Sequence, residues 1–232
     1  MTAIIKLWEL FLDILMPRIC LGCRSKRPEG KMPICNACTA GIRVNKVYGE
    51  LSPRLVLGAA ASYDDQLVRE IIHSLKYKRL SGAAKSLADL IIKHIEFSAL
   101  RNIIKPARSI IVPIPLHPGR LRKRGYNQSE LIAVEIGKYL GVPVRTDILM
   151  RVKRSAPQIK MKNRAARETN IRNAFALNPG FTNKLISLNG EAAKEIILID
   201  DVFTSGATIN EAARTLKGLS PEKIIALVAA KA

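Results

Sequence analysis

Two adjacent acidic residues, Asp200 and Asp201, stand between an aliphatic run and a stretch of small and hydroxyl-bearing residues. Residues 195–200 predict a buried strand, and residues 207–217 predict the helix that follows it. In an open parallel sheet, ligands bind beyond the carboxyl ends of the strands, where the next helix offers free backbone N–H groups to an anion. Carboxylates at the same place can bind sugar hydroxyls. The pattern therefore predicts a pocket for a phosphorylated ribose.

The residues that follow the acidic pair have the chemistry of a phosphate-binding turn. Their hydroxyl groups can donate hydrogen bonds to an anion, and a glycine lets the backbone approach it closely. Aliphatic strands that end in aspartate also occur in nucleotide hydrolases and response regulators, so the whole run 196–208 is the specific signal. The chain has no Gly-x-x-x-x-Gly-Lys-Ser/Thr pattern, which disfavours a P-loop enzyme. The predicted loop consists of Thr204, Ser205, Gly206, Ala207 and Thr208.

All four cysteines of the chain lie near its N-terminus, in the pattern Cys-x2-Cys-x11-Cys-x2-Cys. Two Cys-x-x-Cys knuckles can direct four thiolates at one ion, and four protein ligands leave no open position for catalysis. The pattern therefore predicts a structural zinc site. A disulfide framework is disfavoured, because the remaining chain has no cysteine and does not need disulfide cross-links to fold. Iron–sulfur ligation by the same thiolates is an alternative. The predicted ligands are Cys20, Cys23, Cys35 and Cys38.

The composition describes a globular protein with a strongly basic balance. The chain has 232 residues, of which 48% are hydrophobic, enough for one α/β core and a small appended module. Lys and Arg number 38 against 19 Asp and Glu, for a formal net charge of +19. This excess favours phosphorylated ligands, nucleic acid or acidic membrane surfaces as partners, although it can also reflect the composition of the host's proteins.

Strands and helices alternate over residues 51–232, which predicts one parallel α/β sheet. Residues 1–50 are predicted to form an N-terminal module, in which an amphipathic helix over 4–15 precedes the cysteines. That helix is too short and too often interrupted by charge for a membrane span or a signal sequence. We therefore expect a cytoplasmic protein with no transmembrane segment. Expected strands are 55–63, 109–113, 195–200 and 223–229, with one or two short strands in 142–150; expected helices are 65–76, 83–97, 127–140 and 207–217.

Two basic segments lie between the predicted strands. The first follows the strand at 109–113 as a proline-rich turn with dense positive charge, suited to a diphosphate or a nucleic-acid backbone; an exposed basic loop is the alternative. His117 is a candidate acid or base, although one histidine in such a loop is more often structural. The second segment, 153–167, is a candidate for a mobile hood over substrates or for a solvated linker. Candidate residues of the first segment are Pro115, His117, Arg122, Lys123 and Arg124.

Taken together, these segments are similar to the ComF family of bacterial competence-associated proteins. The resemblance implies a small zinc finger on a type I phosphoribosyltransferase domain. It also implies a link to the uptake of transforming single-stranded DNA, alongside a helicase-like protein and recombination mediators. The residues that carry it are the four-cysteine module, Leu75 to Tyr77, Val112 to Pro118, Arg124 to Gln128, Gln158 with Arg164, Asn173 to Phe175, and the run from Asp200 to Thr208.

The resemblance to type I phosphoribosyltransferases also implies roles for the site residues. Asp200 and Asp201 are expected at the ribose 2- and 3-hydroxyls of 5-phosphoribosyl-1-pyrophosphate (PRPP), and residues 204–208 at its 5-phosphate. Residues 113–119 match the place of the loop that binds the pyrophosphate, which Mg²⁺ would bridge to the ribose hydroxyls. If the protein transfers the pentosyl group, one aspartate would stabilise positive charge on the ribose while basic side chains take up the charge of the leaving pyrophosphate.

Three functions agree with these patterns. The first is a phosphoribosyltransferase-fold protein that binds Mg²⁺-PRPP and acts in the uptake or processing of single-stranded DNA. The second is a non-catalytic adaptor that keeps the phosphoribosyl loop as a fold element and binds nucleic acid or partners, although aromatic residues, at 5% of the chain, provide few stacking platforms. The third is a nucleotide-salvage phosphoribosyltransferase without a link to DNA.

Overall fold

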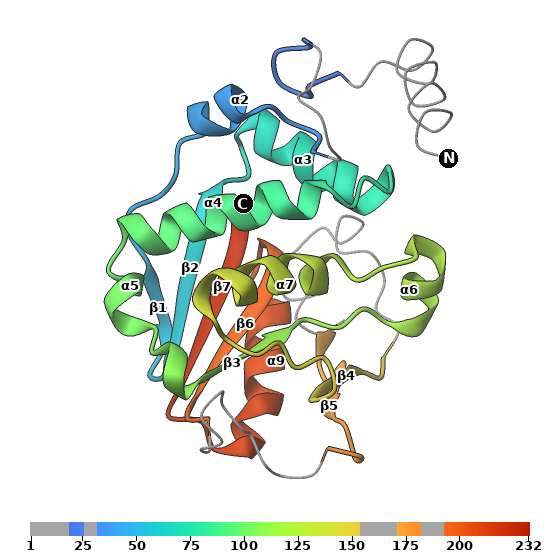
Figure 1. Cartoon of the computed structure of the whole chain (residues 1–232). Helices are drawn as coiled ribbons and strands as arrows, with labels where there is room; N and C mark the ends of the chain where they lie inside the picture. Colours follow the sequence, from blue (N-terminus) through green and yellow to red (C-terminus); the bar gives the residue numbers. More distant parts are fainter. Residues whose placement is uncertain (1–18, 26–31, 154–170, 182–192) are drawn as a thin grey trace, which may run out of the picture.

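A five-stranded sheet forms the centre of the computed structural model, which describes residues 19–25, 32–153, 171–181 and 193–232 (Figure 1). The strand order is β1-β2-β7-β6-β3. Strands β2, β7, β6 and β3 run parallel, and β1 pairs antiparallel with β2 at one edge. The bounds are β1 Gly49–Ser52, β2 Leu55–Ser62, β3 Ser109–Pro113, β6 Glu195–Phe203 and β7 Lys223–Lys231.

Helices cover both faces of this sheet (Figure 1). Helices α3, α4 and α7 lie on one face, and α9 lies on the other. Along β6, Ile197 and Ile199 belong to the core under the first three helices, whereas Ile196 and Leu198 belong to the core under α9. Burial on both faces explains why the strand is continuously aliphatic. The bounds are α3 Gln66–Tyr77, α4 Ala83–Phe97, α7 Gln128–Leu140 and α9 Ala207–Leu216.

The main predicted elements agree closely with the structure. The predicted bounds of the helix at 83–97 and the strand at 109–113 are those observed. Helix α7 ends at Gly141, whose φ of 65° is the left-handed conformation that favours glycine. The antiparallel edge strand β1 was not expected. Strand β6 also continues three residues beyond the predicted end at Asp200, so the acidic pair lies inside the strand.

Shorter elements connect the sheet and its helices. Strands β4 and β5 pair antiparallel as a separate two-stranded ribbon. Helix α6 occupies the segment that was expected to be a basic turn, because Pro118 at its first position suits a helix start. These elements are α2 Asn36–Gly41, α5 Leu100–Ile103, η1 Pro106–Arg108, α6 Pro118–Arg124, β4 Leu149–Arg151, β5 Phe175–Leu177 and η3 Lys217–Leu219.

Two predicted segments lie outside the described residues: the N-terminal helix at 4–15, and all of the basic hood at 153–167 except its first residue. Among the helices that the structure describes, none has the length and apolar character needed to cross a bilayer.

The cysteine-bearing segment packs directly on the sheet domain. Cys20, Ile34 and Ile42 are buried in the same hydrophobic cluster as α3 and α4. Hydrogen bonds add to this packing: Asn45 donates its Nδ2 to the carbonyl oxygen of Ala59 at 2.8 Å, and its own carbonyl oxygen accepts from His94 Nδ1 at 2.6 Å. The domain boundary between residues 50 and 51 stays a prediction.

Gly58 in β2 lies where an added methyl group would lack room. A Cβ atom there would stand 2.6 Å from Leu100 Cδ1 and 2.9 Å from Leu227 Cδ2. We expect Gly58→Ala to lower the free energy of unfolding by about 1–3 kcal/mol, because overpacking forces neighbouring side chains from their rotamers. Chemical denaturation measures the change. Gly49→Ala in β1, whose Cβ would meet nothing within 4 Å, is the matched control. Equal stability of Gly58→Ala and wild type would contradict this packing.

Candidate functional site

The acidic pair lies near the carboxyl end of β6, between its parallel neighbours β7 and β3. Asp201 is 4% exposed, and Asp200 is half-buried. Successive side chains of a strand point to opposite faces, so two consecutive acids would ordinarily separate. Here both carboxylates receive hydrogen bonds from the first turn of α7, through Gln128 and Ser129. The end of β6 and the beginning of α7 therefore form one site.

Both carboxylate oxygens of Asp201 have partners within the protein. Lys76 Nζ lies 2.8 Å from Oδ1, and Gln128 Nε2 donates a hydrogen bond to Oδ2 at 3.0 Å. Burial opposes the charge on Lys76, but the attraction of Asp201 outweighs it and raises the pKa of that lysine. A lysine at the end of α3 thus neutralises the more buried of the two aspartates.

Asp200 has weaker compensation for its charge. The hydroxyl of Ser129 donates to Oδ1 at 3.0 Å, and the backbone N–H of Asp201 donates to the same oxygen at 2.9 Å. Burial and the neighbouring Asp201 carboxylate together raise the pKa of Asp200 to about 7. The positive end of the α7 dipole favours both carboxylates, because Gln128 and Ser129 are the first residues of that helix. Asp200 is therefore partly protonated near neutral pH.

Arg151 in β4 is a second cation that interacts electrostatically with the pair, through Asp200. Its guanidinium carbon lies 5.3 Å from the centre of the Phe175 ring. Burial lowers the pKa of Arg151, as does the nearby charge of Arg120, whereas Asp200 acts in the opposite direction. Arg151 Nε is buried without a hydrogen-bond partner among the described residues. Electrostatically, Arg151 connects the basic helix α6 with the acidic pair.

The predicted phosphate loop leads from β6 into α9. Gly206 caps that helix with a φ of 80°, and a Cβ atom there would stand 2.8 Å from Phe203 Cζ. Only glycine suits this position, because its backbone is left-handed and the aromatic ring covers it. Thr204 and Ser205 line a surface hollow of about 640 Å³, whose lining does not include the aspartates. Ala207 and Thr208 are the first residues of α9, where backbone N–H groups favour an anion.

The residues predicted around the first basic segment separate into two groups. Pro115 and His117 lie in the loop between β3 and α6, where His117 Nδ1 accepts a hydrogen bond from the backbone N–H of Gly119 at 3.1 Å. This contact gives the histidine a structural role as the cap of α6. Arg122 and Lys123 are exposed on α6, and in the described part of the chain they form no ion pair with the aspartates.

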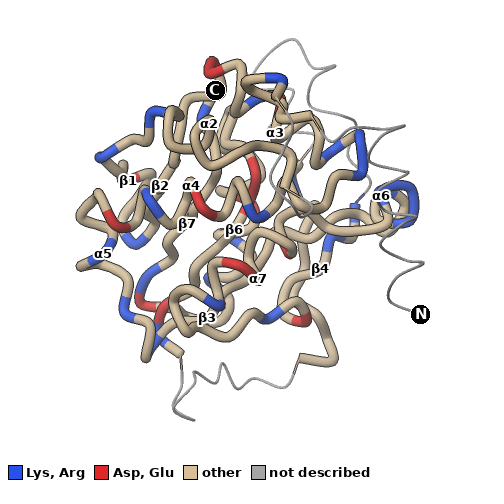
Figure 2. Tube along the Cα trace, turned by 45° about the horizontal axis from the view of Figure 1, so that its top comes forward, with Lys and Arg blue, Asp and Glu red and all other residues tan. Residues whose placement is uncertain are grey.

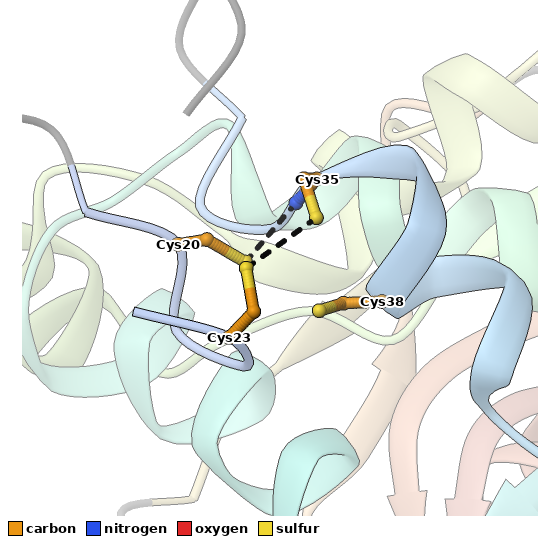
Figure 3. Close-up of side chains that lie close together, drawn as sticks. All are labelled: Cys20, Cys23, Cys35 and Cys38. Carbon is orange, nitrogen blue, oxygen red and sulfur yellow. Dashed lines mark hydrogen bonds between the residues drawn. The ribbon is translucent and has the colours of Figure 1, made fainter. Parts of the chain in front are cut away.

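The four cysteine sulfurs converge on one point (Figure 3). All four Sγ atoms lie within 4.8 Å of one another, and those of Cys23 and Cys35 are 3.8 Å apart. A tetrahedral ion with Zn–S bonds of about 2.3 Å holds its sulfurs ~3.8 Å apart. The backbone N–H of Cys35 also donates to Cys20 Sγ at 3.3 Å. The four cysteines, all within the described residues, are free of disulfides, so the cluster has the geometry of a metal centre.

The thiols of this cluster compete for ionisation. Burial opposes the thiolate of Cys20, but backbone N–H groups outweigh it and lower the pKa of Cys20 to about 6. Hydrogen bonding to Cys35 and burial raise the pKa of Cys38 to about 12. Because like charges repel at this separation, four thiolates can coexist only around a cation. Such a cluster therefore suits a divalent metal ion.

Sequence reasoning assigned no role to four residues that the structure brings to the acidic pair. The sequence predicted that a helix begins near Gln128 and Ser129. It did not predict that these two residues contact the acidic pair, because that contact depends on how α7 packs against β6. Lys76 lies in the segment Leu75 to Tyr77 that carries the family resemblance, but that segment alone does not indicate a contact with the aspartates. Arg151 has no local signal that distinguishes it from the other basic residues of the chain.

Replacing Asp200 with asparagine should stabilise the fold more at high pH than at low pH. Its folded pKa, about 7, is above the ordinary value of 3.8, so the wild-type fold loses stability as pH rises between these values. Asparagine carries no charge and can still accept the hydrogen bond from Ser129. Thermal melts of the variant and the wild type at about pH 5 and about pH 8 measure the difference.

Asp147→Asn is the control for that prediction. Arg145 lowers the pKa of Asp147, so this substitution should remove stability that is present above the ordinary pKa of the carboxyl group. A gain for Asp200→Asn that does not grow with pH would contradict a raised pKa at the acidic pair.

Known proteins provide an independent comparison. Residues 127–232, which include α7, β6 and α9, match the phosphoribosyl transferase domain family. Competence protein F of Haemophilus influenzae is 26% identical over 222 residues, covering 88% of this chain and 93% of that protein. DNA utilization protein YhgH of Salmonella typhi is 26% identical over 222 residues, covering 88% and 92%. Competence protein ComFC of Bacillus subtilis is 28% identical over 213 residues, covering 86% and 78%.

These relatives cover 86–88% of the chain, more than the phosphoribosyl transferase domain match alone. With four clustered cysteines ahead of a phosphoribosyltransferase fold, the chain resembles the competence and DNA utilization proteins of the ComF family over most of its length.

Proposed function

We propose that this protein binds Mg²⁺-PRPP at the acidic pair and the loop 204–208, and that it acts in the cytoplasm in the uptake or processing of single-stranded DNA. One observation carries the proposal: the acidic pair, half-buried Asp200 and buried Asp201, precedes by one short loop a helix that begins at a left-handed glycine. Carboxylates bind ribose hydroxyls, and a helix N-terminus binds a phosphate. The match to the phosphoribosyl transferase domain family covers these elements.

The side chains of the site suit magnesium and a phosphoribosyl group. Mg²⁺ prefers oxygen ligands and keeps several of its waters, and the two aspartates supply carboxylate oxygens. Gln128 Oε1, beside Asp201, and Ser205 Oγ, in the loop, are buried without hydrogen-bond partners among the described residues. Buried polar atoms of this kind are costly unless a ligand or water satisfies them. They suit a ribose hydroxyl and a phosphate oxygen, respectively. When bound, Mg²⁺ neutralises charge on the pyrophosphate.

Basic side chains support a place for the pyrophosphate on the α6 side of the site. Arg151 interacts electrostatically with Asp200 and with Arg120, which places Arg151 within range of the acidic pair. We propose that the residues expected from the sequence also bind the pyrophosphate: Pro115, His117, Arg122, Lys123 and Arg124. For His117 the proposal is binding through the loop, since its Nδ1 already caps α6.

The role in DNA uptake or processing is supported by the relatives and by charge. Two of the relatives are named competence proteins, and a third is named a DNA utilization protein. The formal net charge of +19 favours a polyanionic partner. Helicase-like and recombination-mediator proteins of DNA uptake are proposed partners on the family resemblance. Four free thiols in one cluster suit a reducing compartment, which supports the cytoplasm.

A non-catalytic adaptor is the second candidate, and the contacts of Asp201 favour it. Both oxygens of this carboxylate are engaged by side chains of the protein itself. A ligand that bound there would compete with Lys76 and Gln128 for the carboxylate, which costs free energy. In an adaptor, this closed arrangement would be the functional state, and the aspartates would stabilise the fold.

Calorimetric titration with Mg²⁺-PRPP separates the two candidates. We expect binding with a dissociation constant in the micromolar range, roughly −8 kcal/mol, and loss of binding in Asp201→Asn and Thr204→Ala. Lys76→Met should raise the affinity of the folded variant for Mg²⁺-PRPP, because this lysine competes with the ligand for Asp201.

Asp147→Asn, an exposed acid paired with Arg145, is the matched control and should keep wild-type affinity. No heat from folded wild-type protein at ligand concentrations of about 1 mM, with no thermal shift, would refute the PRPP pocket and favour the adaptor.

We also propose that the metal of the four-cysteine cluster is a structural zinc ion. All four ligand positions are filled by the protein, which leaves none open for a substrate. The cluster lies on the beginning of α3: a Cβ atom at Gly22 would stand 2.8 Å from Cys38 Sγ and 3.3 Å from Leu67 Cδ2. Loss of the metal should therefore loosen the packing at that end of the helix.

Replacement of one ligand tests the metal directly. We expect purified wild-type protein to contain about one zinc per chain and Cys38→Ser to lose most of it with a lower melting temperature. Elemental analysis and thermal melts provide the two readouts. Asn36→Ala, an exposed substitution between the cysteines, should change neither. Iron with visible absorbance in place of zinc, or unchanged metal content in Cys38→Ser, would contradict the proposal.

A further inference from the structure

An exposed aromatic ring lies at the C-terminal end of α3, one residue after the lysine that pairs with Asp201. Tyr77 is 57% exposed, although large hydrophobic residues are ordinarily buried. Its place follows from the helix: Leu75 packs into the core, Lys76 turns towards the acidic pair, and Tyr77 faces solvent. The fold therefore presents an aromatic face next to the candidate phosphoribosyl site.

Two side chains, His73 and Arg124, lie beside the Tyr77 ring. The His73 ring lies 4.7 Å from the Tyr77 ring, centre to centre, at an interplanar angle of 44°. The guanidinium of Arg124 lies over Tyr77 at 5.9 Å from the ring centre. The ring therefore has an arginine within cation–π range and a second, tilted ring beside it, as in an aromatic stacking site.

The same contacts join α3 to the basic helix α6. Arg79 Nη2 donates to the carbonyl oxygen of Lys123 at 3.3 Å, and Tyr126 donates its hydroxyl to the carbonyl oxygen of Leu75 at 2.6 Å. Figure 2 shows the basic residues along α6. Arg79, Arg122 and Lys123 are exposed on this surface. We name the surface formed by Tyr77, Arg79, Arg122, Lys123 and Arg124 the α3–α6 platform.

We propose that the α3–α6 platform binds single-stranded nucleic acid, with one base stacked on Tyr77 and the backbone phosphates on Arg79, Arg122 and Lys123. This inference deepens the proposed role in DNA uptake or processing and rests on it. Strand binding of this kind combines a positive track with aromatic stacking, and it requires an unpaired base. Few aromatic residues are present in the chain, but one at the end of a basic track is enough to anchor a strand.

The position of the platform also has a functional consequence. Lys76 and Tyr77 are consecutive, so a base stacked on Tyr77 would lie at the same end of α3 as the lysine that pairs with Asp201. Nucleic acid and PRPP would then bind at neighbouring parts of one surface, on either side of the end of α3. The chemistry at the platform itself is binding, and no bond is made or broken there.

Fluorescence anisotropy with labelled oligothymidine of about 12 nucleotides tests the platform. We expect Tyr77→Ala to weaken binding roughly 5- to 150-fold, the range for one lost base–aromatic stack, and Tyr77→Phe to retain it. Arg122→Ala and Lys123→Ala should weaken binding and reduce the dependence of log affinity on log salt by roughly 0.7 per contact.

Tyr139→Ala is the matched control. Tyr139 is also exposed, at 49%, but its hydroxyl donates to Glu96 at 2.8 Å, and an acid beside the ring disfavours a phosphate backbone. This variant should bind the oligonucleotide as the wild type does. Circular dichroism of each variant establishes that it is folded before binding is compared.

Three outcomes would overturn the inference: unchanged binding in folded Tyr77→Ala, equal affinity for duplex and single-stranded DNA, or no binding of oligothymidine at low salt. Asp201→Asn keeps the test separate from the PRPP proposal. It should lose PRPP and retain oligonucleotide binding, because Asp201 does not belong to the platform. If the wild-type protein binds the oligonucleotide but does not bind PRPP, the PRPP site is refuted and the α3–α6 platform is not.

Discussion

Two carboxylates on consecutive, poorly exposed residues impose the constraint on which the structure around the site depends. Asp200 and Asp201 repel each other, and burial adds to the cost of their charge. Lys76 from α3 and the first turn of α7 compensate, so elements far apart in the chain must meet at the end of β6. Removing one partner of such a buried pair typically costs roughly 3–5 kcal/mol. The helices that cover this face of the sheet are thereby held to the site.

Helix α3 joins three features that lie apart in the sequence. At its beginning, Leu67 packs beside the cysteine cluster; at its end, Lys76 reaches the acidic pair and Tyr77 faces solvent. A helix of twelve residues extends about 18 Å, which is the distance that it can bridge between the metal centre and the site. The cysteine module is therefore part of the support of the α/β domain, since it packs on the helix that supplies the lysine.

Much of the fold was predictable from the sequence because its signals are local. The periodicity of α4, the aliphatic run of β3 and the glycine after α7 each specify an element without reference to the rest of the chain. The cysteine spacing likewise predicted the cluster. Lys76 and Arg151 could not be predicted as neighbours of the acidic pair, because their approach to it depends on how distant parts of the chain pack together. The short helix α6 was missed because its basic residues carry no apolar periodicity.

A crystal structure of the protein with Mg²⁺-PRPP would show directly whether the acidic pair and the loop bind this ligand. We expect the ribose hydroxyls at Asp200 and Asp201 and the 5-phosphate at residues 204–208. We also expect the contacts of Lys76 and Gln128 with Asp201 to change, since each engages one oxygen of that carboxylate. PRPP bound elsewhere, or an unchanged Lys76–Asp201 pair with no ligand at saturating concentration, would contradict the proposal.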